Sequence, residues 1–125
     1  MNVASGNCTE SAEKLLQQAL DLLVQGDSAR AARTFQAALA QDSQCYEAHH
    51  GLIRALREAG HLEQSIGAAL ALTALTPNDP LAHTALSISL QQAGHIPQAE
   101  AAAARARVLE WRAELQSPST AEFES

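Results

Sequence analysis

Histidine has the widest chemical range of the residue types in this chain, because an imidazole can carry a proton, activate a nucleophile or bind a metal near neutral pH. The chain has five histidines, and four of them form two pairs with the same spacing: His49 with His83, and His61 with His95. The second pair stands in a repeated Ala-Gly-His sequence. Recurrence at one fixed spacing is typical of a duplicated structural unit. We therefore interpret these histidines as structural rather than catalytic.

Metal-binding and nucleophilic motifs are the next candidates for chemistry. Cys45 and His49 lie four residues apart and would place two metal ligands on one helical face, but no further ligand follows at a zinc-site spacing. The chain has no glycine-rich phosphate loop, no G-x-S-x-G and no H-E-x-x-H. Nothing in the sequence groups a serine, a histidine and an acid into a triad. The sequence therefore predicts no catalytic residue, no metal and no cofactor, and a protein that is not an enzyme.

The elements that carry these residues follow from a regular pattern of helix breaks. Gly26, Gly60 and Gly94 are evenly spaced, at the same interval as the paired histidines, and each separates two segments with helical spacing of apolar residues. The apolar residues are mostly Ala and Leu, which favour helix over strand. The pattern predicts six helices, at roughly 9–25, 28–42, 45–59, 62–75, 80–93 and 97–116.

A helix–turn–helix unit whose length equals the interval between these glycines resembles the tetratricopeptide repeat, which has a period of about 34 residues. Three units match its pattern, at about 12–45, 46–79 and 80–113. The resemblance implies an all-α fold, an α-solenoid of three repeats over residues 9–116, with flexible tails at 1–8 and 117–125. Trp111 replaces the proline that usually closes a unit, so we expect the last helix to be extended. The matching residues include Leu15, Ala19, Leu22, Ala31, Phe35, Ala38, His49, Leu52, Leu56, Leu72, Pro77, His83, Leu86, Leu90, Ala99, Ala103 and Ala106.

Charge and composition limit the partners and the compartment. The formal net charge is −6 with a single lysine, which argues against nucleic acid as a partner. The first residues have neither a basic start nor an apolar run, and no segment is apolar enough to span a membrane. Two cysteines, Cys8 and Cys45, are too few for a disulfide framework. We therefore expect reduced cysteines and a cytoplasmic protein.

The two ends of the array differ in sequence. The stripe that would face a preceding unit is polar in the first helix, so we expect no unit before it; this stripe is Lys14, Gln18, Asp21 and Gln25. At the other end, Val108, Leu109 and Trp111 are hard to leave exposed. Either the chain's own tail or another chain would cover them.

The resemblance also implies a concave groove lined by the first helix of each unit. Leu15, Ala19 and Leu22 form one apolar stripe for packing. A second stripe, the leucine stripe, lies beside it and consists of Leu16, Leu20 and Leu23. Either a partner or the chain's own ends would cover this second stripe. A subset of this family holds the C-terminal carboxylate of its ligand with Lys and Asn at set groove positions. This chain has Leu16 and Leu20 at those positions, so that carboxylate clamp is absent. The predicted groove residues are Leu16, Leu20, Leu23, His50, Arg54, Arg57, Leu81, Thr84 and Ile88.

These observations predict a protein–protein interaction module that holds a peptide or helix of a partner protein in the groove. Arg54 and Arg57 would pair with carboxylates of the ligand, or with Glu47 and Glu58 of their own helix. The alternative is a structural protein that forms a homodimer through the leucine stripe or the last helix.

Overall fold

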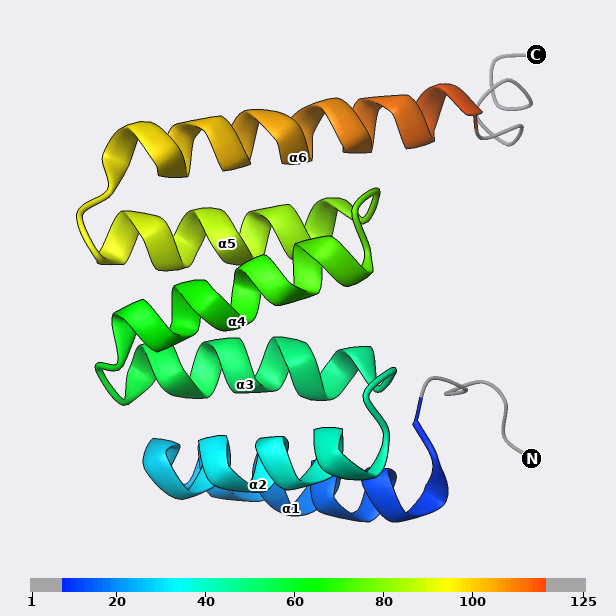
Figure 1. The fold of residues 1–125 in the computed structure, drawn as a ribbon, viewed down its shortest axis with the longest axis vertical. Helices are drawn as coiled ribbons and strands as arrows, with labels where there is room; N and C mark the ends of the chain where they lie inside the picture. Colours follow the sequence, from blue (N-terminus) through cyan, green and yellow to red (C-terminus); the bar gives the residue numbers. More distant parts are fainter. Residues whose placement is uncertain (1–7, 117–125) are drawn as a thin grey trace.

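The computed structural model describes residues 8–116 as a single stack of antiparallel helices (Figure 1). Consecutive helices pack side by side, and the first helices of the three units, α1, α3 and α5, are also in contact with one another in order. The all-α solenoid is therefore confirmed. The helices are α1 (Glu10–Val24), α2 (Ser28–Gln41), α3 (Tyr46–Glu58), α4 (Leu62–Leu75), α5 (Pro80–Gln92) and α6 (Ile96–Gln116). The predicted tails lie outside the described residues, except for Cys8.

The three turns between the helices of each unit have the same backbone geometry. Gly26, Gly60 and Gly94 have φ values of 89°, 86° and 89°, a left-handed conformation that only glycine adopts readily. The residue after each glycine donates its backbone N–H to a carbonyl five residues earlier; for His61 the acceptor is Leu56 O at 2.8 Å. Each glycine also donates its own N–H to a carbonyl three residues earlier, as Gly60 does to Arg57 O at 3.0 Å. The two bonds satisfy carbonyls at the end of the helix. The repeated Ala-Gly-His sequence is therefore a helix stop.

His49 and His83 attach their units to the loop that precedes each one. His49 Nε2 lies 2.9 Å from Ser43 O, and His83 Nε2 lies 2.9 Å from Pro77 O, the equivalent carbonyl of the next unit. An imidazole N–H therefore donates to the same loop carbonyl in both units. These contacts agree with a structural role for both residues.

Small residues allow close packing of the two helices inside each unit. In the second unit Ser65 Oγ on α4 donates to Ile53 O on α3 at 3.0 Å. In the third unit the hydroxyl belongs to the other helix, since Ser87 Oγ on α5 donates to Ala99 O on α6 at 2.8 Å. Ser65 Oγ also lies 2.7 Å from Ser89 Oγ, so both buried hydroxyls are satisfied.

One close contact between units depends on the absence of a side chain. Phe35 of α2 is fully buried, and its ring lies against Gly51 of α3. A Cβ on Gly51 would overlap this ring, whereas a Cβ on the other helical glycine, Gly67 of α4, would meet nothing within 4 Å. Gly51 therefore sets the distance between the first and second units.

A disulfide joins Cys8 to Cys45, so the expectation of two reduced cysteines is wrong. Cys8 precedes α1 and Cys45 precedes α3, and their Cα atoms are 4.5 Å apart. In a repeat stack the starts of α1 and α3 lie at the same edge, which brings together cysteines separated by 37 residues. The backbone N–H of Thr9 also donates to Asp42 Oδ2 at 2.9 Å, which holds this edge in place.

The first and last helices differ from the other four in exposure and in length. The polar stripe of α1 that has no neighbouring unit is exposed, whereas the equivalent residues of α3 and α5 are buried or half-buried. The last helix α6 has 21 residues, against 13–15 in the other five, and extends past the loop between α4 and α5 (Figure 1). Within residues 8–116, no helix is long and apolar enough to cross a membrane.

Candidate functional site

Two adjoining hollows run across the first helices of the three units. The first lies between α1 and α3, has a volume of about 430 Å³ and is lined by Leu16, Gln17, Leu20, Leu23, Glu47, His50, Gly51 and Arg54. The second lies between α3 and α5, has a volume of about 260 Å³ and is lined by His50, Ile53, Arg54, Arg57, Leu81, Thr84, Ala85 and Ile88. We call the two together the groove. His50 and Arg54 line both hollows and therefore stand between them on α3.

All nine residues predicted from the sequence line this groove, but they differ in accessibility. Leu20, Leu81 and Ile88 are exposed at 37%, 62% and 37%, so their apolar side chains are accessible from solvent. Leu16 and Leu23 are buried at 0% and 8%, so they form its floor and belong to the core. Sequence reasoning did not select Gln17, Gly51, Ile53 and Ala85.

The second leucine stripe of α1 is therefore mostly a packing surface, which corrects the sequence interpretation. The buried residues of α1 are Ala12, Leu16, Ala19 and Leu23, whereas Leu15 and Leu22 are half-buried. The physical reason is that α1 packs against both α2 and α3, and two neighbours require a wider apolar face than one.

The two arginines of α3 that line the groove, Arg54 and Arg57, differ in their contacts. Arg54 Nε lies 2.8 Å from Glu58 Oε2, in an exposed ion pair within α3. Among the residues that the structure describes, Arg57 forms no ion pair within 4.0 Å. Burial lowers the pKa of Arg57, and the charge of Glu58 partly offsets this effect. A half-buried guanidinium without a partner would gain from a carboxylate brought by a ligand.

His50 lies at the junction of the two hollows and is half-buried. Burial lowers its pKa, the carboxylate of Asp79 acts in the opposite direction, and His49 lowers the pKa further. The imidazole is therefore neutral at pH 7 and can both donate and accept a hydrogen bond.

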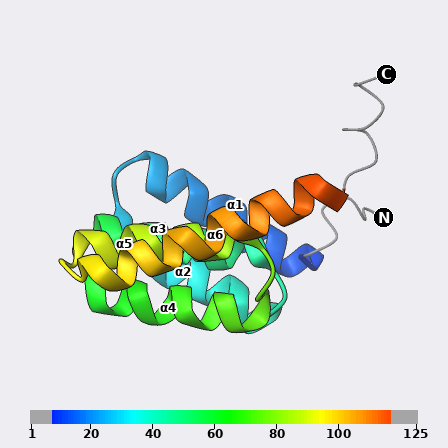
Figure 2. The ribbon, with the colours of Figure 1, turned by 90° about the horizontal axis from the view of Figure 1, so that it is seen from above.

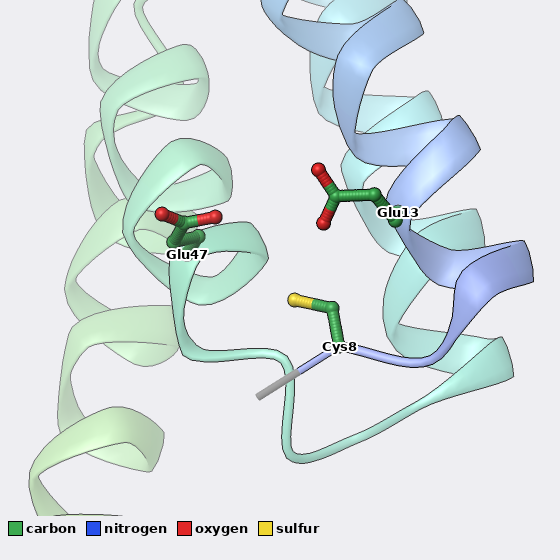
Figure 3. A group of neighbouring side chains, drawn as sticks. All are labelled: Cys8, Glu13 and Glu47. Carbon is green, nitrogen blue, oxygen red and sulfur yellow. The ribbon is translucent and has the colours of Figure 1, made fainter. Parts of the chain in front are cut away.

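Two carboxylates face each other at the edge of the first hollow (Figure 3). Glu13 of α1 and Glu47 of α3 lie beside the sulfur of Cys8, with ligand atoms all within 4.8 Å of one another. Gln17 Nε2 donates to Glu13 Oε2 at 3.1 Å, while Glu13 Oε1 is buried without a hydrogen-bond partner. Because the sulfur is bonded to Cys45, it is no thiolate ligand, and two carboxylates are fewer ligands than zinc or calcium takes. This edge therefore contributes negative charge to the groove.

The family assignment comes from a match to a sequence profile. The tetratricopeptide repeat profile matches residues 16–80, more than half of the chain. The chain belongs to the tetratricopeptide repeat family. The matched segment contains α2, α3 and α4, most of α1 and the start of α5. No curated protein sequence matches the chain.

Solved structures with the same fold include other tetratricopeptide-like proteins. The type III secretion translocator chaperone SycD of Yersinia enterocolitica, in an alternative dimer, has a TM-score of 0.75 and 20% identity, with 93% of this chain and 85% of SycD covered. SycD in complex with a peptide of the translocator YopD gives a TM-score of 0.75 at 20% identity, covering 93% and 86%. MamA (MSR-1) has a TM-score of 0.74 and 19% identity, with 82% of this chain and 59% of the MamA chain covered. At these identities the similarity establishes the fold.

Proposed function

We propose that this tetratricopeptide repeat protein is a protein-interaction module that binds a peptide or helix of a partner protein in the groove. The observation that carries the proposal is the pair of adjoining hollows that share His50 and Arg54 in their linings. A linear segment that crosses α1, α3 and α5 would contact both hollows at once. The peptide complex of the structurally similar SycD supports the same use of the fold.

The lining of the groove specifies the chemistry of the ligand. Exposed Leu20, Leu81 and Ile88 would receive aliphatic or aromatic side chains, which supply most of the affinity. Arg57 would receive a carboxylate between these anchors, because its guanidinium is only half-exposed. The carboxylates of Glu13 and Glu47 at the disulfide edge disfavour a second acid there, so the ligand would bind in one direction.

The alternative function is a homodimer, which the alternative dimer of SycD supports. Burial of Leu16 and Leu23 leaves only Leu20 of the leucine stripe exposed, so this stripe offers little area for self-association. A dimer would therefore need another surface. The molar mass measured over a range of concentrations distinguishes the two functions, since groove binding requires no self-association.

We expect Leu20→Glu and Arg57→Glu each to weaken binding of a groove ligand by about tenfold or more, because each removes one anchor and introduces repulsion. The ligands would be peptides selected from a random display library on the purified chain. Dissociation constants would then be measured by fluorescence anisotropy for the wild type and the variants.

Matched control variants are available on the helices that lie outside the groove. Leu70 of α4 is exposed at 52%, and Arg33 of α2 is exposed. We expect Leu70→Glu and Arg33→Glu to leave the dissociation constants unchanged. If the selected peptides bind all four variants as tightly as the wild type, the proposal that the groove is the binding site is wrong.

Binding of acidic peptides should strengthen as the pH falls from about 7.5 to 5.5. In the free protein burial lowers the pKa of His50, so the imidazole is neutral at pH 7. A ligand carboxylate beside it favours the protonated form and raises its pKa, so the complex takes up a proton and its dissociation constant falls with pH. We expect about a threefold to tenfold change, measured by calorimetry at several pH values. His50→Gln should remove this pH dependence, and its persistence in that variant would assign it to another group.

A further inference from the structure

The last helix carries an apolar stripe that faces solvent. Val108, Trp111 and Leu115 are exposed at 42%, 63% and 69%, and their spacing places them on one face of α6. The residues of α6 that pack against α5 lie on the opposite face: Ala99, Ala102, Ala106 and Leu109. We call Val108, Trp111 and Leu115 the α6 stripe.

The α6 stripe is not a remnant of the contact between successive units. The residues at the position of Val108 in the two earlier units are Ala74 and Ala40, which are exposed and small. The positions that α2 and α4 bury as Ala32 and Ile66 correspond in α6 to Glu100, which is exposed. The face of α6 that would receive another unit is therefore charged, and the apolar stripe is a separate surface.

Arginines flank this stripe. Arg105 and Arg112 are seven residues apart and therefore lie on the same side of it, while Arg107 lies on the other side between Glu100 and Glu114. Within residues 8–116 none of these three arginines forms an ion pair. Three of the eight basic residues of a chain with net charge −6 thus lie within eight residues of the last helix.

We propose that the α6 stripe docks an amphipathic helix of another protein, with carboxylates on the side that faces Arg105 and Arg112. An apolar stripe with charged flanks is the usual surface for helix–helix recognition, in which the flanks select the partner. This proposal is independent of the groove, because the stripe and the groove share no residue and, within residues 8–116, α6 contacts no helix other than α5.

The charges favour such a partner over a second copy of the chain. Antiparallel pairing of two α6 helices would place Arg105 and Arg112 against the same arginines of the other copy. Parallel pairing in register would bring Arg107 close to Arg112 of the other copy, and this repulsion offsets the attraction between Glu100 and Arg105 of the other copy. A net charge of −6 also opposes binding to an anionic membrane surface. A partner helix with carboxylates on one flank alone would place them against Arg105 and Arg112, and it avoids the contacts between arginines of two copies.

The stripe contains the only tryptophan of the chain, so fluorescence of Trp111 reports on this surface alone. The probe is a synthetic, tryptophan-free helical peptide with leucine along one face, glutamate on one flank and glutamine on the other. Its matched control has lysine in place of each glutamate. We expect the acidic peptide to shift the emission of Trp111 to shorter wavelength, and to bind at least about tenfold more tightly than the basic one.

Variants test the roles of the stripe and of its flank separately. Trp111→Ala should weaken binding of a dye-labelled acidic peptide by about tenfold or more. Arg105→Glu with Arg112→Glu should reverse the preference, so that the basic peptide binds more tightly. All three side chains are exposed, so circular dichroism should show unchanged folding. The groove variant Leu20→Glu should bind the acidic peptide as the wild type does, which separates this proposal from the proposed function.

Four results would overturn the inference. The first is equal binding of the acidic and basic peptides. The second is a shift of Trp111 emission with protein concentration in the absence of peptide, which would make a second copy the occupant. The third is a shift to longer wavelength after removal of residues 117–125, which would make that segment the occupant. The fourth is a stronger shift with anionic phospholipid vesicles than with the acidic peptide.

Discussion

Replacement of both cysteines, as Cys8→Ser with Cys45→Ala, is expected to lower the free energy of unfolding by about 3–4 kcal/mol. The bond closes a loop of 37 residues, and the chain-entropy relation gives a stabilisation of about 4 kcal/mol for a loop of this length. Alanine is chosen for Cys45 because that residue is fully buried and a serine hydroxyl there would need a partner. Urea denaturation followed by circular dichroism measures the difference.

Reduction provides the matched control for this prediction. Dithiothreitol should destabilise the wild type to the level of the double variant and leave the double variant unchanged. Equal midpoints for oxidised and reduced wild type would show that the bond does not stabilise the fold. Disulfides persist in oxidising compartments, so thiol titration of the protein isolated from its source would also test the cytoplasmic location, which stays a prediction.

Substitution of the two helical glycines by alanine is expected to have opposite effects. Alanine favours a helix interior over glycine by about 1 kcal/mol, and Gly67→Ala should stabilise the protein by about this amount, since its Cβ would meet nothing within 4 Å. Gly51→Ala should instead lower the free energy of unfolding by about 2 kcal/mol, because its Cβ would overlap the ring of buried Phe35. Thermal and urea unfolding of both variants would measure the direction of each change in the free energy of unfolding.

A double variant identifies why Gly51→Ala lowers the free energy of unfolding. Phe35→Leu removes the ring that Gly51→Ala would strike, so the two substitutions together should cost less than the sum of their separate effects. Additive effects, or a stabilising Gly51→Ala, would contradict the account of this contact.

Much of the fold follows from local features of the sequence. The glycines at 26, 60 and 94 stop helices through backbone geometry that each sets within a few residues, and Asp27 and Asp79 cap the helices that follow. The predicted helix bounds consequently lie within about two residues of those in the structure. The position of the groove follows as well, because a repeat of fixed period places equivalent residues on one side of the stack.

The sequence alone did not predict features that depend on contact between two distant segments of the chain. The disulfide requires Cys8 and Cys45 to meet, and a count of two cysteines carries no information about the edge they share. The burial of Leu16 and Leu23 depends on α1 having two neighbours, whereas the periodicity of α1 shows only that it is amphipathic. Gly51 had a local signal, a glycine inside a predicted helix, but its reason lies in Phe35 of another helix.

The attachment of the helices is unequal along the stack. The disulfide fastens the start of α1 to the start of α3, whereas within residues 8–116 α6 is in contact only with α5. Figure 1 shows α6 at the end of the stack opposite α1 and α2, and in Figure 2 it lies in front of the other helices. We therefore expect local opening to begin at α6 rather than at the end that the disulfide holds. A ligand in the hollow between α3 and α5 would brace the looser half, so occupancy of the groove and order at the far end of the solenoid rise together.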